Sequence, residues 1–215
     1  MLNNAINSTS PRRAAMVVGI AFLTSVLVVT LVDDFLLPNF VVPGDTSALA
    51  RDIEANPETF LFAAIGYLTV LVLDSIIAVA LYVVLKPASR RRAALMSALR
   101  LLYAAVLTIG VLALLFQMVD AYGYAQIKLL GYIFFASHIL VLGYSVILSG
   151  YIPKALGVWL IVAAFTYAVF VVDIQLPAAL SLLTMLMMAG AELALSVWLM
   201  VKRKNLPERS FRDTD

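Results

Sequence analysis

The chain alternates long apolar stretches with short polar breaks. The apolar stretches cover residues 14–32, 59–85, 93–119, 127–149, 153–172 and 178–201. A helix rises about 1.5 Å per residue, so roughly 20 residues cross a hydrocarbon core about 30 Å thick. The pattern therefore predicts an all-α fold, in which residues 14–201 form a single domain built as a six-transmembrane-helix bundle.

The breaks contain residues that end and begin helices. Gly150 and Pro153 supply a stop and a start between the fourth and fifth stretches, because glycine favours the position after a helix and proline its first turn. Residues Asp120–Tyr124 are expected to form a tight turn, whose tyrosines suit the membrane interface.

The longest break covers residues 39–58. Within residues 45–55, Leu49 and Ile53 lie one helical turn apart, which favours a short interfacial helix on the outer membrane surface. Asn56–Pro57 then offers a cap and a first-turn proline to the second stretch.

The first apolar stretch follows Arg12–Arg13, so a signal peptide is its rival interpretation. The apolar core of a signal peptide has about 7–15 residues and ends in small residues at a cleavage site. Here residues 14–32 contain no charge, and Asp33–Asp34 follows them. We therefore expect a retained first helix.

The composition agrees with a membrane protein. Hydrophobic residues make up 63% of the 215 and charged residues 13%, with a mean hydropathy of +1.01. Soluble domains are about half apolar and a quarter charged. The absence of cysteine excludes disulfides, thiolate metal sites and cysteine nucleophiles.

The basic residues are distributed unevenly. With the N-terminus inside, the inner segments contain Arg12, Arg13, Lys86, Arg90, Arg91, Arg92, Lys154, Lys202, Arg203, Lys204, Arg209 and Arg212. The outer segments contain Arg51 and Lys128, and Arg100 lies within a span. The positive-inside rule therefore predicts that both tails, residues 1–13 and 202–215, are cytoplasmic. We expect a multi-pass protein of the cell membrane, with the lipid bilayer as a partner and no nucleic-acid binding.

Four ionisable residues interrupt the apolar stretches: Asp74, Arg100, His138 and Glu192. Each lies roughly 12–18 Å from the inner end of its predicted helix. A charge at the centre of a transmembrane helix costs about 2.5–3.5 kcal/mol, so all four are expected to face the bundle interior. Arg100 can form a bidentate ion pair with either carboxylate, and the other carboxylate can then accept the imidazole N–H.

Other polar residues share helix faces with these four. Helical spacing places them on the same inward stripes. They are Tyr67, Tyr82, Tyr103, Gln117, Ser145 and Ser196.

Three functions are compatible with this buried group. It can form a ligand, ion or proton site for transport or sensing, since buried intramembrane charge is usually functional. It can instead hold helices together in a structural or partner subunit. It can also serve an intramembrane enzyme acting on a lipid or isoprenoid, with His138 as general base. No HExxH, GxSxG, GxGxxG or phosphate-loop motif occurs, so neither catalytic residues nor a metal or cofactor site are assigned.

Three segments resemble one family of prokaryotic membrane proteins. They are VLDSIIAVALYVVLKP at residues 72–87, SGYIPKALGV at 149–158 and AGAELALSVWLMVK at 189–202. The chain resembles the family designated domain of unknown function 4386 over nearly its whole length, apart from the two tails. In the family pattern, the ionisable positions match Asp74, Arg100, His138 and Glu192. The resemblance implies six helices and a shared polar centre, and it implies no activity.

Overall fold

The computed structural model describes residues 9–36, 51, 53–171 and 177–208 of the chain. In this part the fold is all-helical and contains no strand. Its elements are α2 (Pro11–Leu31), the π-helix η1 (Val32–Leu36), α4 (Pro57–Leu85), α5 (Arg90–Leu115), α6 (Ala121–Ile147), α7 (Lys154–Val171), α8 (Ala178–Val201) and the 3₁₀ helix η2 (Arg203–Asn205).

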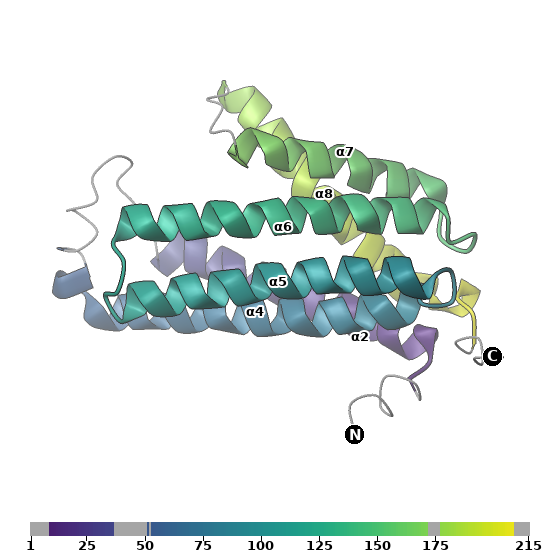
Figure 1. The fold of residues 1–215 in the computed structure, drawn as a ribbon, viewed down its shortest axis with the longest axis horizontal. Helices are drawn as coiled ribbons and strands as arrows, with labels where there is room; N and C mark the ends of the chain where they lie inside the picture. Colours follow the sequence, from purple (N-terminus) through teal and green to yellow (C-terminus); the bar gives the residue numbers. More distant parts are fainter. Residues whose placement is uncertain (1–8, 37–50, 52, 172–176, 209–215) are drawn as a thin grey trace.

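The helices form a closed bundle. Each of α2, α4, α5, α6, α7 and α8 packs against the next along the chain, and α8 packs back against α2. Figure 1 shows α4, α5 and α6 running side by side along the long axis, with α7 above α6 at a slight tilt and α8 running obliquely behind them. Successive helices run in opposite directions, so α2 begins and α8 ends at the same end of the bundle.

Within the described residues, five helices are long and apolar enough to cross a membrane: α2, α4, α5, α6 and α8. The apolar stretch of α7, Lys154–Tyr167, is shorter. Large apolar side chains such as Leu27, Phe62 and Ile109 are exposed on the outer surface of the helices. Soluble monomers rarely expose apolar patches of this extent, so the surface is suited to lipid.

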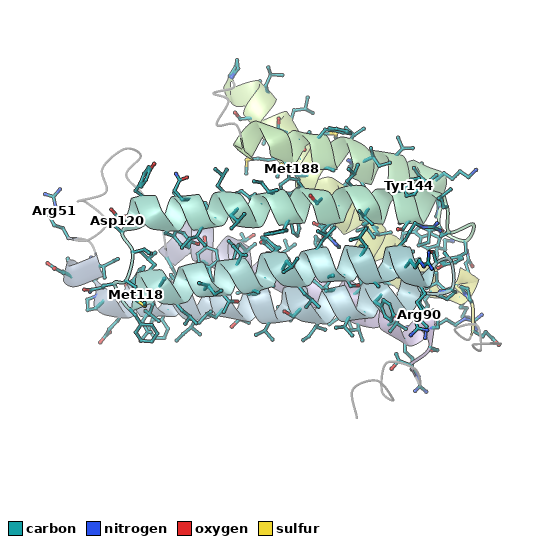
Figure 2. All side chains as sticks on the ribbon, in the orientation of Figure 1. Arg51, Arg90, Met118, Asp120, Tyr144 and Met188 are labelled. Carbon is teal, nitrogen blue, oxygen red and sulfur yellow. The ribbon has the colours of Figure 1, made fainter. Side chains whose placement is uncertain are left out.

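The two ends of the bundle differ in charge. We call the end that contains the α4–α5 and α6–α7 turns the basic end; Arg90 and Tyr144 mark it in Figure 2, and Arg51, Met118 and Asp120 mark the opposite end. At the basic end, Gly150 adopts a φ of +77°, which glycine tolerates without strain. Tyr151 donates to the carbonyl of Val84 at 2.7 Å and so ties this turn to α4. Burial raises the pKa of Tyr151, which keeps its hydroxyl protonated.

Helices α2 and α5 begin at Pro11 and Arg90, earlier than expected, because serine caps precede their arginines. Ser10 Oγ accepts from the Arg13 amide and Ser89 Oγ from the Arg92 amide, each at 3.4 Å. The arginine runs therefore lie in the first turns of α2 and α5, rather than outside them. After α2, the helical backbone continues as η1 through Asp33–Asp34.

The expected boundary between the third and fourth stretches was wrong. Helix α5 ends at Leu115, since Gln117 adopts a positive φ of 55°. Residues Asp120–Tyr124 do not form a separate turn: the Asp120 carboxylate caps α6 by accepting from the Gly123 amide at 2.8 Å. An aspartate in this position satisfies an amide that the helix itself leaves unpaired.

The start of α4 follows the prediction only in part. Pro57 is its first residue, but the Asn56 side chain makes no capping hydrogen bond. Arg51 and residues 53–55 are helical. The remainder of the expected interfacial helix, residues 45–50 and 52, lies outside the described residues.

Candidate functional site: a buried ion cluster

The fold brings the four intramembrane ionisable residues together from four helices. We call them the ion cluster: Asp74 of α4 (4% exposed), Arg100 of α5 (2%), His138 of α6 (0%) and Glu192 of α8 (8%). Every one of these helices belongs to the closed bundle, so the group is enclosed by neighbouring helices.

Arg100 bridges both carboxylates. Its Nε donates to Asp74 Oδ1 at 3.0 Å, and its Nη2 donates to the same oxygen. Its Nη1 donates to Glu192 Oε2 at 2.8 Å. The sequence left the partner of Arg100 open between the two, and in the structure the guanidinium divides its donors between them. A guanidinium presents five N–H groups in a fixed plane and can therefore serve two acceptors.

His138 is neutral in this arrangement. Its Nδ1 lies 2.8 Å from the carbonyl oxygen of Met96, which can only accept, so Nδ1 carries the proton. Its Nε2 lies 3.2 Å from Arg100 Nη1, which can only donate, so Nε2 is unprotonated. The expectation that a carboxylate accepts the imidazole N–H was wrong, because a backbone carbonyl takes that position.

An aromatic layer covers the cluster on the side away from the basic end. It consists of Tyr103, Tyr132, Phe135 and Tyr167. The Phe135 ring centroid lies 5.1 Å from Arg100 Cζ, 4.5 Å from the Tyr103 ring and 5.2 Å from the Tyr167 ring. The ring of Tyr132 lies 6.4 Å from that of Tyr167. Aromatic faces attract cations, so Phe135 gives Arg100 a further favourable contact.

One family model matches most of the chain. The family model named domain of unknown function (DUF4386) matches residues 17–202. The chain belongs to this family. It is also 37% identical over 123 residues to an uncharacterized protein of Archaeoglobus fulgidus, a match that covers 57% of this chain and 74% of that protein. No solved structure matches.

The DUF4386 region contains the complete ion cluster and the aromatic layer. The match therefore confirms the family that the sequence resemblance predicted. Sequence reasoning missed three members of the aromatic layer: Tyr132, Phe135 and Tyr167. Phe135 had a usable signal, since it lies three residues before His138 and hence on the same helix face.

The six supporting polar residues are not all at the cluster. Tyr103 belongs to the aromatic layer. Ser145 is buried, but its hydroxyl donates to the Val141 carbonyl of its own helix at 2.7 Å. Ser196 is buried on α8, one turn beyond Glu192. Gln117 is exposed past the end of α5 and does not join the cluster.

The two remaining tyrosines, Tyr67 and Tyr82, pack against other parts of the bundle. Tyr67 lies on the α4–α5 core of the opposite end. Tyr82 packs on the larger core toward the basic end. The sequence predicted that both tyrosines share an inward polar stripe with Asp74. In the structure they pack instead on two different apolar cores.

Proposed function

We propose that this DUF4386 protein is a six-span protein of the prokaryotic cell membrane whose ion cluster binds a proton for transport or sensing. In this proposal residues 14–201 form one transmembrane domain, and residues 1–13 and 202–215 are cytoplasmic tails. Helix α7 serves as the sixth span: at about 1.5 Å per residue its 18 residues extend about 27 Å. The cations of the basic end support a cytoplasmic location for that end.

The charge balance of the cluster is the observation that carries the proton assignment. Arg100 is its one cation, Asp74 and Glu192 are two carboxylates, and the hydrogen bonds of His138 make the imidazole neutral. With both carboxylates ionised the cluster has a net charge of −1 in a buried site. An uncompensated buried charge costs several kcal/mol. One added proton removes this charge.

A metal cation fits the cluster less well than a proton. Among the described residues no group of three or more His, Asp or Glu side chains is placed to hold a metal ion. The Arg100 guanidinium occupies the space between the two carboxylates. A second cation there would meet its positive charge at short range.

Glu192 is the better candidate for the added proton. Asp74 accepts two N–H donors of Arg100, whereas Glu192 accepts one. Donated hydrogen bonds stabilise the ionised form of a carboxylate, so we assign the added proton to the carboxylate that accepts fewer of them.

Difference infrared spectroscopy of the purified protein tests this assignment. The wild type should show the carbonyl stretch of a protonated, buried carboxylic acid near neutral pH. The signal should shift in frequency in Glu192→Asp and stay unchanged in the matched variant Asp74→Glu, because both exchanges keep the charge of the cluster. It should disappear in Glu192→Gln. A wild type without this signal throughout its stable pH range would overturn the proton site. A frequency shift in Asp74→Glu but not in Glu192→Asp would assign the proton to Asp74.

Reconstitution into vesicles with a trapped pH indicator addresses transport. Wild-type vesicles should exchange protons across the membrane in response to a pH gradient, and Glu192→Gln vesicles should not. If both preparations behave as protein-free vesicles while the infrared signal is present, the bound proton serves sensing instead.

A structural role is the second candidate, and the complete pairing of the cluster favours it. All four side chains have partners, and no unsatisfied buried side-chain atom occurs in the cluster within the described part of the chain. Buried ion pairs can be replaced by apolar residues without loss of stability. The combined variant Asp74→Leu, Arg100→Met, Glu192→Leu should then remain folded and should keep any proton exchange seen in the wild type. Loss of that exchange from a stably folded variant would contradict a purely structural role.

The intramembrane-enzyme interpretation receives no support from the site. His138 is fully buried, and both of its ring nitrogens are engaged. A general base must reach the proton that it abstracts, directly or through one water.

A further inference from the structure

The basic end has a strong excess of positive charge. The cations there lie at the termini of α2, α4, α5, α7 and α8: Arg12, Arg13, Lys86, Arg90, Arg91, Arg92, Lys154, Lys202, Arg203 and Lys204. Among the described residues of this end, Glu208 is the one carboxylate. Arg12 already holds it at 2.7 Å and also donates to two backbone carbonyls that follow α8.

The first turn of α5 concentrates this charge. Residues Arg90–Arg92 open the helix, and no acidic residue lies in that turn. Cations at a helix N-terminus face the positive end of the helix dipole, which is unfavourable. A bound anion would offset both the dipole and the mutual repulsion of the arginines.

Arg92 is placed differently from its two neighbours. Arg90 and Arg91 are exposed, whereas Arg92 is half-buried between α5 and α6. Its Cζ lies 5.9 Å from the Tyr144 ring centroid, and its Nη2 reaches the Ala88 carbonyl only at 3.5 Å. Its Nε is buried and has no hydrogen-bond partner among the described residues. The guanidinium therefore keeps N–H donors that no described protein group accepts.

Tyr144 indicates what can reach this guanidinium. Its side chain is 52% exposed on the surface of α6, at the same end of the bundle as Arg90 (Figure 2). Tyrosine is enriched where a membrane helix meets the headgroup layer. An arginine beside it lies at the depth of lipid phosphates, and a guanidinium matches a phosphate with two parallel N–H donors.

We propose that Arg92, beside Tyr144 on the α5–α6 surface, binds the phosphate of an anionic phospholipid. The site rests on the membrane spans of the proposed function and is independent of the proton site. Basic residues next to a membrane surface attract anionic lipids. Arg92 turns this general attraction into binding at one place.

Native mass spectrometry of the full-length protein in detergent with added phosphatidylglycerol tests the site. The wild type should retain one phosphatidylglycerol that Arg92→Gln loses. Arg203→Gln, which removes an exposed cation of η2 at the same end, should retain it. Equal retention by wild type and Arg92→Gln would overturn the proposal, as would equal loss in both variants, which indicates unspecific charge attraction.

Two further measurements identify the ligand and keep the test decisive if a variant misfolds. Phosphatidylcholine should bind clearly less than phosphatidylglycerol, and inorganic phosphate alone should not compete; equal phosphatidylcholine binding or effective competition by phosphate would overturn a site for anionic lipid. Arg92→Lys retains the charge but lacks the two parallel N–H donors of a guanidinium, so it should bind the lipid several-fold more weakly. If Arg92→Gln does not fold, unchanged binding by Arg92→Lys contradicts the proposal.

Discussion

From the basic end to the aromatic layer beside the ion cluster, helices α2, α4, α5, α6, α7 and α8 all contribute buried side chains to one apolar core. On the other side, the buried residues of the second core come from α4 and α5 alone. There the first half of α8 is exposed around much of its circumference, at Leu180, Leu182, Leu183, Met185 and Leu186. The tilt of α7 and α8 away from the other helices in Figure 1 agrees with this difference.

The ion cluster lies where the dense packing ends. Glu192 is the point at which α8 connects, through Arg100, to Asp74 and His138 of the other helices. Few packed neighbours mean a low cost of local rearrangement. The basic-end half should therefore determine stability, while the opposite half of α8 should tolerate change. The following predictions test this division, beginning with the largest effect.

Replacing Arg100 should have the largest effect. Arg100→Met leaves two carboxylates buried without their cation, and removing one partner of a buried ion pair costs about 3–5 kcal/mol. Equilibrium unfolding of the purified protein in mixed detergent micelles measures the change, with Arg203→Met at the exposed rim as the matched control. A loss below about 1 kcal/mol would indicate that the cluster does not hold the two halves together.

A cavity near the basic end should cost more than truncation in the outer half of α8. Leu142 is 1% exposed and Leu183 is 51% exposed. Leu142→Ala should lower the free energy of unfolding by about 2 kcal/mol, since lost packing is not recovered in a dense core. Leu183→Ala should change it by less than about 0.5 kcal/mol. Similar losses in the two variants, measured by the same unfolding assay, would contradict the division.

An added methyl group should likewise destabilise the protein more in the basic-end half than in the opposite half. A Cβ at Gly143 would lie 2.7 Å from the Gly157 carbonyl oxygen of α7, so backbone would have to shift. At Gly110, the nearest atom is the Ile127 side-chain methyl at 2.8 Å, which can move. Gly143→Ala should destabilise by about 1–2 kcal/mol, and Gly110→Ala by less. The opposite order of melting temperatures would show that the close α6–α7 contact is not limiting.

The smallest effect is expected at the exposed rim. Arg12 and Glu208 form an ion pair at 2.7 Å, with side chains 36% and 76% exposed. Exposed pairs contribute about 0–1 kcal/mol and are screened by salt. Glu208→Gln should therefore change stability by less than about 1 kcal/mol at low salt and less still at high salt. A larger, salt-independent loss would mean that the two hydrogen bonds from Arg12 to backbone carbonyls depend on Glu208.

The sequence by itself located each helix, and its largest error is at the start of α6, predicted at residue 127 and observed at Ala121. The last residue of α4, Leu85, and both ends of α8 agree with the apolar stretches, because length and hydropathy are local properties. The errors are local too. Val119 and Met118 extended an apolar stretch past the end of α5, although Gln117 turns the backbone and Asp120 caps the next helix.

The sequence also singled out the four members of the ion cluster, because charges are costly in lipid wherever the helices lie. Only the tertiary structure decided how they pair. Arg100 and Glu192 lie 92 positions apart in the chain, and His138 bonds to a carbonyl 42 positions away. These contacts depend on how each helix is rotated and which helices are neighbours. A periodic pattern identifies one face of a helix, but it does not say which residues of other helices pack against that face.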